Sequence, residues 1–112
     1  MFIEPPPNKP EDTYTWLLKL QERLIQDDLK GSATWDAASI ADGDEEAATV
    51  TVTGAVVGDY AIASLSIDIT DLVLDAQVTA ADTVTCVLAN NTGGAIDLAS
   101  ATVYARVFRR TI

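Results

Sequence analysis

The sequence predicts a mainly β protein: a single small antiparallel β-sandwich, jelly-roll-like, preceded by a proline-rich arm and one amphipathic α-helix. Apolar residues recur at helical spacing before Gly31, and from Ser32 onward they alternate with other residues at period two. Turn-forming residues separate the alternating runs at spacings of roughly 8–12 residues, which is typical of a β-sandwich. The chain therefore divides into residues 1–31, the arm and helix, and residues 32–112, the sandwich.

The arm and the helix begin and end at recognisable residues. Residues 1–10 hold all four prolines, three of them consecutive, which favours an extended polyproline-like arm. Pro10 suits the first position of a helix, and the two acidic residues that follow it complement the positive end of the helix dipole. Lys30 followed by Gly31 predicts the end of this helix.

One face of the predicted helix is apolar. At helical spacing this face holds Tyr14, Leu17, Leu18, Leu24, Ile25 and Leu29, and its edge is widened by Trp16 and Leu20. The stripe could fold back on its own sandwich, or it could be buried against sister subunits or a host surface. The stripe is broader than a two-stranded seam requires, and we favour its burial against sister subunits or a host surface over an exposed helix. The residues expected to make this oligomer or anchor contact are Tyr14, Trp16, Leu17, Leu18, Leu20, Leu24 and Ile25.

The strands of the sandwich are predicted from alternation. In one run Thr49, Thr51 and Thr53 alternate with Val50 and Val52, which is the pattern of a half-buried strand. In chain order, the predicted strands cover residues 34–40, 49–53, 60–67, 72–79, 83–88 and 102–109. The short side chains of this alanine- and threonine-rich region predict a thin core, and a thin core favours association of copies.

The charge and the rarest residues exclude several functions. Seventeen acidic residues oppose seven basic ones, for a net charge of −10, which disfavours nucleic acid and anionic membranes as partners. The chain has no histidine and one cysteine, so it contains no Ser-His-Asp triad, no histidine-ligated metal and no intrachain disulfide. We expect no enzyme: no catalytic residue, no cofactor and no metal ion.

Five features of the sequence are candidate sites. The acidic run 42–46 could hold Ca²⁺, but it lacks the ligand spacing of an EF-hand, so we favour a solvated loop before the strand. Cys86 is expected as a small buried residue, and Trp35 as a core or hinge anchor. Residues 90–94 are expected to form a polar turn. Three arginines at the last predicted strand could contact nucleic acid, but we favour ion pairs between subunits: Arg106, Arg109 and Arg110.

The sandwich region resembles a small module of tailed-bacteriophage virion proteins, including head decorations, head fibres and tail-associated fibres. The segments that carry the resemblance are TWDAASIADG (34–43), TVTVTGAVVGD (49–59), VTAADTVT (78–85) and NNTGGAIDLAS (90–100). The chain departs from the family at Ala37, where proline is frequent, and at Ala101, where glycine is frequent. The resemblance implies a structural role in the virion, usually as a trimer, and it carries over no catalytic residues.

We therefore expect a bacteriophage capsid decoration protein of the cement or head-fibre type, located on the capsid surface. Its expected partners are itself, as a homotrimer, and the major capsid protein or another virion protein. The alternative is a tail- or head-fibre tip module that binds host-surface glycan, for which Tyr60 is nearly the only aromatic candidate in the loops. A small regulatory protein fits the acidity but not the resemblance.

Overall fold

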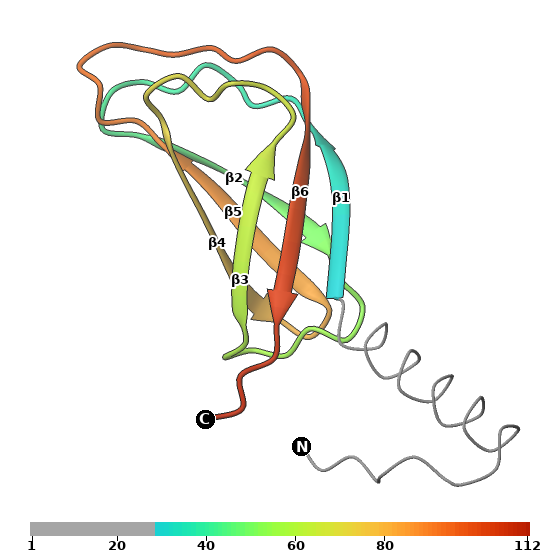
Figure 1. Cartoon of the computed structure of the whole chain (residues 1–112). Coiled ribbons are helices and arrows are strands. Elements are labelled where there is room, and N and C mark those ends of the chain that lie inside the picture. Colours follow the sequence, from blue (N-terminus) through green and yellow to red (C-terminus); the bar gives the residue numbers. More distant parts are fainter. Residues whose placement is uncertain (1–28) are drawn as a thin grey trace, which may run out of the picture.

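The computed structural model describes residues 29–112, which form two antiparallel three-stranded sheets packed as a small β-sandwich (Figure 1). The predicted arm and the predicted helix up to residue 28 lie outside the described residues. The strands are β1 (Leu29–Trp35), β2 (Glu45–Thr51), β3 (Tyr60–Leu65), β4 (Val73–Ala80), β5 (Thr83–Ala89) and β6 (Ala101–Phe108).

Both sheets pair strands that are far apart in the sequence. The first sheet has the order β1-β6-β3 and the second sheet has the order β2-β5-β4. The last two strands are therefore the central ones, and each is flanked by two strands from earlier in the chain. The edges of the first sheet are β1 and β3, so these two strands border its outer face.

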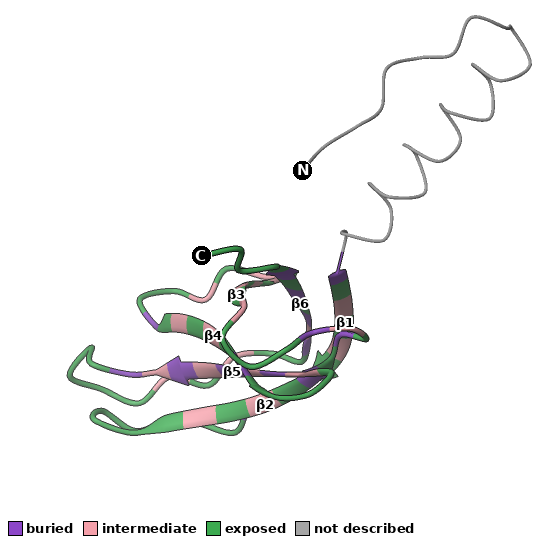
Figure 2. Cartoon of the chain, turned by 90° about the horizontal axis from the view of Figure 1, so that it is seen from below, coloured by how far each residue is buried: buried purple, intermediate pink, exposed green. Residues whose placement is uncertain are grey.

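A single core lies between the sheets. Inward positions alternate with outward ones along every strand, as the burial colouring of Figure 2 shows. Valine and alanine dominate the core, together with a few larger side chains: Leu29, Trp35, Ile40, Leu72 and Leu88. The predictions that Cys86 is buried and that Trp35 lies in the core are confirmed.

The N-terminal boundary of the sandwich differs from the prediction. β1 begins at Leu29, so the helix end predicted at Lys30 and Gly31 is wrong, and Leu29 is a core residue. Gly31 serves a different purpose from a helix cap. A Cβ atom at this position would meet the backbone carbonyl oxygen of Thr51 and would lie 3.2 Å from Cγ1 of Val50. Glycine is needed here because the two sheets approach closely at this point.

Two further boundaries are corrected. The strand predicted over 34–40 ends at Trp35, and Ile40 forms only an isolated bridge with Ile96. The acidic run 42–46 is not entirely loop, because β2 begins at Glu45.

Asn90 joins the loops at one end of the sandwich. Its side chain is 0% exposed, and its Nδ2 group donates to the carbonyl oxygens of Ile40 (2.7 Å) and Gly94 (2.8 Å). Its Oδ1 atom accepts from the backbone N–H (2.9 Å) and the hydroxyl (2.8 Å) of Thr92. Both amide hydrogens and both lone pairs are thereby used, so this buried polar side chain is fully satisfied. The predicted polar turn is thus also a structural anchor.

Candidate functional site

The interaction residues predicted from the sequence belong to the segment before the sandwich. They all precede β1 and lie outside the described residues: Tyr14, Trp16, Leu17, Leu18, Leu20, Leu24 and Ile25. Within residues 29–112, no helix has the length and apolar character needed to cross a membrane.

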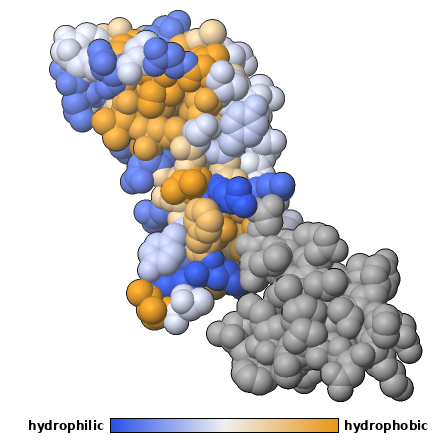
Figure 3. Space-filling view, in the orientation of Figure 1, coloured by the Kyte–Doolittle hydropathy of each residue, from blue (hydrophilic) through white to orange (hydrophobic). Residues whose placement is uncertain are grey.

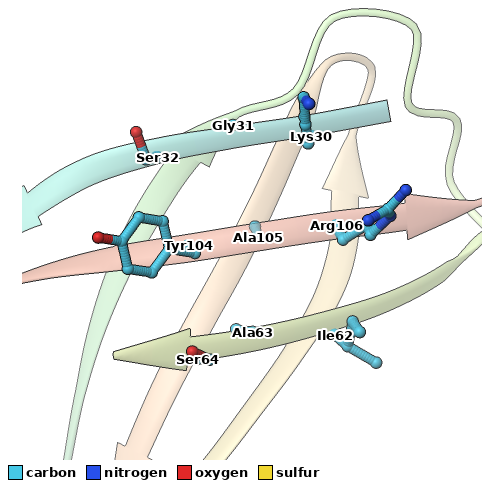
Figure 4. Close-up of a pocket in the computed structure, with 9 residues that line it drawn as sticks. All are labelled: Lys30, Gly31, Ser32, Ile62, Ala63, Ser64, Tyr104, Ala105 and Arg106. Carbon is cyan, nitrogen blue, oxygen red and sulfur yellow. The ribbon is translucent and has the colours of Figure 1, made fainter. Parts of the chain in front are cut away.

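The described part of the chain contains a groove on the outer face of the first sheet (Figure 4). Its volume is about 430 Å³, within the range of ligand-binding clefts. Strand pairing arranges its lining side chains in rows across the sheet. One outward row contains Lys30, Arg106 and Ile62, and the next outward row contains Ser32, Tyr104 and Ser64.

Small residues form the floor of the groove. Gly31, Ala105 and Ala63 are paired across the three strands, between the two outward rows. These three positions face the second sheet, so on the outer side only backbone lies between the two rows of side chains. The hollow is therefore the backbone strip between the rows, and the outward side chains form its walls.

The electrostatic character of this face differs from that of the rest of the chain. Outward positions of β1, β6 and β3 include two bases, Lys30 and Arg106, and no Asp or Glu. The Arg106 guanidinium lies 5.7 Å from the centre of the Phe108 ring, within the range of a cation–π contact. The outer face of the second sheet, by contrast, carries the carboxylates of Glu45 and Asp75.

Large apolar side chains are exposed on the same face. Tyr60 is 51% exposed, Ile62 57%, Tyr104 48% and Phe108 47%. Tyr60 pairs with Phe108 in the row beyond Ile62 and Arg106, so apolar surface continues past the groove. Figure 3 shows a further apolar area on this side of the molecule, toward the end of the sandwich where the β3–β4 loop lies in Figure 1. The name outer face, used alone, denotes the outward-facing residues of β1, β6 and β3; the corresponding surface of the other sheet is always called the outer face of the second sheet.

Sequence reasoning did not identify this face. The period-two pattern does place Tyr104, Arg106 and Phe108 on one side of a strand, opposite Val103 and Val107. It does not reveal that β3 lies beside β6 and adds Tyr60 and Ile62 to that side. The available signal was the presence of large apolar residues on both sides of the same strand, which an exposed strand does not need.

The other predicted candidates are accounted for structurally. Asp42 accepts from the backbone N–H of Gly93 (3.0 Å), and Asp44 accepts from the N–H of Glu45 (2.9 Å). Among residues 29–112, no three acidic or cysteine side chains are grouped so that they could hold a metal ion. Burial raises the pKa of the Cys86 thiol, which keeps it protonated and poorly nucleophilic.

The outer face can therefore make contacts, in which aromatic rings and apolar chains bury area and the two bases attract anionic groups. Of the three arginines predicted to form ion pairs between subunits, Arg106 lies on the outer face. Arg110 lies just after β6 and donates its backbone N–H to Asp59 (3.1 Å).

Comparison of the chain with protein-family models, with curated proteins and with solved structures finds no match.

Proposed function

We propose that the chain is a structural protein of a bacteriophage virion, a capsid decoration protein of the cement or head-fibre type. In this proposal residues 1–28 attach the protein to the major capsid protein or another virion protein, and the protein is a homotrimer on the capsid surface. The sandwich projects from the shell or bridges neighbouring capsomers. The chain acts through contacts and is not an enzyme.

The observation that carries the proposal is how the sandwich joins the preceding segment. In the sequence, the segment predicted to form the proline-rich arm and the apolar helix is followed at once by β1, an edge strand of the first sheet. A sandwich joined to an anchoring segment through one edge strand is suited to display on a surface. The phage-module resemblance supports the proposal, since its four segments fall in and between the strands of the sandwich. We further propose that the strand order is that of an abbreviated jelly roll.

Co-sedimentation with capsid shells of the encoding phage tests the proposal. Leu17→Ser and Leu24→Ser in the full chain should abolish shell binding, because they remove apolar contact from the predicted stripe. Gln26→Ser, on the opposite side of the predicted helix, should bind like the wild type. A deletion for the same assay must stop at residue 28, because Leu29 is a core residue of the sandwich. Undiminished binding by both leucine variants and by the deletion would refute the anchoring role.

A second candidate function, binding of host-surface glycan, is favoured by the groove. Tyr104 offers an exposed ring for stacking against a sugar, and Ser32 and Ser64 lie in the same row with hydroxyl groups. A glycan array tests this function with the wild type and Tyr104→Ala. Hits that the Tyr104 variant loses would support it, and an array without hits would reject it.

A further inference from the structure

The outer face carries an unusual share of the exposed apolar side chains. Eight large hydrophobic residues are exposed within residues 29–112, and four of them lie on this face: Tyr60, Ile62, Tyr104 and Phe108. The outer face of the second sheet contributes one, Val73. Exposed aromatic and aliphatic side chains gathered on one face, interspersed with Lys30, Arg106 and serines, are typical of a surface that is covered in the functional state.

β3 carries large apolar side chains on the side that faces water. It turns Ala61, Ala63 and, at its end, Leu65 toward the second sheet, and it turns Tyr60 and Ile62 toward solvent. A strand that served only its own core would place its larger apolar side chains inward, where burial removes more apolar area from water. The apolar side chains of β3 are thus distributed as if its outer face were also buried.

The distribution of charge favours copies of the same chain as the covering partner. Each copy has a net charge of −10, so two copies repel each other wherever acidic surfaces meet. The outer face has no Asp or Glu and two bases, Lys30 and Arg106. Contact through this face therefore keeps the acidic surfaces of the copies apart.

We propose that the outer face packs against other copies of this chain and forms the subunit interface of the homotrimer. This inference rests on the proposed assembly role and names the surface that would hold the copies together. β1 lies at the edge of this face and directly follows the predicted apolar stripe, so both surfaces would be buried around one axis of assembly. A groove-sized ligand would cover only the rows of Arg106 and Tyr104, leaving Tyr60 and Phe108 exposed.

Sedimentation velocity of the full chain tests the interface with a matched pair of variants. Ile62→Asp puts a carboxylate on the outer face, whereas Val73→Asp puts one on the outer face of the second sheet. Both residues lie on edge strands and are similarly exposed, 57% and 55%. Ile62→Asp should weaken association by about tenfold or more, because it removes apolar contact area and brings into the interface a carboxylate whose desolvation cost the neighbouring Arg106 offsets only in part. Val73→Asp should leave association unchanged.

Several results would overturn the inference. These are a monomeric wild type, an Ile62→Asp variant that associates like the wild type, or a Val73→Asp variant that loses association equally. Circular dichroism checks that each variant is folded. If Ile62→Asp does not fold, Tyr104→Ser serves in its place, since it removes only an exposed ring and should weaken association in the same direction.

Salt provides an independent readout. Raising ionic strength from about 0.05 M to about 0.5 M screens the repulsion between acidic copies, so association through an apolar face should strengthen. Association that weakened with salt would overturn the inference, because it would indicate a contact held by attraction between opposite charges.

Shell binding separates this inference from the proposed function. If Ile62→Asp associates and binds shells like the wild type, the interface is refuted and the decoration role stands. If Ile62→Asp loses association while the wild type binds no shells, the interface is supported and the decoration role is refuted.

Discussion

Replacing Asn90 by aspartate is expected to destabilise the sandwich by about 3–5 kcal/mol at neutral pH. The substitution keeps the shape of the side chain but replaces its donating Nδ2 group by an oxygen. Two hydrogen bonds are lost, to the carbonyl oxygens of Ile40 (2.7 Å) and Gly94 (2.8 Å). At about 1 kcal/mol each these bonds account for about 2 kcal/mol. The remainder is the cost of holding a buried carboxylate beside two carbonyl oxygens.

The effect should depend on pH with a defined sign. Burial and the two carbonyl oxygens raise the pKa of the introduced carboxyl in the folded state above its value in the unfolded chain, about 3.9. The charge penalty is therefore absent below about pH 3.9. It grows as the pH rises above that value, and it is complete above the raised folded-state pKa. Below that pH the protonated carboxyl can donate its single O–H to one of the two carbonyl oxygens, so at least one of the two donated hydrogen bonds is lost at every pH.

Urea unfolding of the full chain, at one protein concentration and at several pH values, measures the difference from the wild type. Asn91→Asp is the matched control, because it makes the same chemical change at an exposed neighbouring residue and should alter stability by less than about 0.5 kcal/mol. An Asn90→Asp variant as stable as the wild type at pH 7 would refute the anchoring role of this side chain.

Three further changes test the packing of the sandwich. Gly31→Ala should destabilise it by about 2–4 kcal/mol in a thermal melt, because the Cβ atom would meet the backbone of β2, whereas Gly94→Ala meets nothing within 4 Å and should have little effect. The Cys86 thiol, which is buried and has a raised pKa, should not react with iodoacetamide at pH 8 until the protein unfolds; rapid reaction in the native protein would contradict the assigned burial. Asp82→Ala should lower the free energy of unfolding by about 1–2 kcal/mol, since it removes the carboxylate oxygen that accepts from the Gly54 N–H (2.7 Å). Asp82 itself has a φ of 61°, a conformation that asparagine also adopts, so Asp82→Asn should retain most of that stability.

The faces of the strands could be predicted from the sequence because alternation is a local property. The alternation predicted for β5 and β6 matches the burial observed for Val84, Cys86, Val103 and Val107. The boundary at Leu29 could not be predicted in the same way. Leu29 continues the helical spacing of the preceding apolar residues, and it equally fits the inward alternation of β1. Pairing with β6 decides between the two, and pairing is not a local property.

The candidate site depends on long-range neighbours to a greater extent. Tyr60 and Tyr104 are far apart in the sequence, and only the order β1-β6-β3 brings them onto one face. The role of Gly31 likewise follows from the approach of the second sheet, and that of Asn90 from loops that meet across the chain. Such contacts leave no periodic signal in a single sequence.

Electron cryo-microscopy of the virions of the encoding phage tests the central claim most directly. We predict density for the sandwich on the capsid surface, in clusters of three, with the outer face turned toward the axis of each cluster and the acidic face of the second sheet, with Glu45 and Asp75, turned away from it. Virions that lack such density, in a preparation where the chain is expressed, would contradict the decoration role. Clusters held together through the second sheet would contradict the proposed interface.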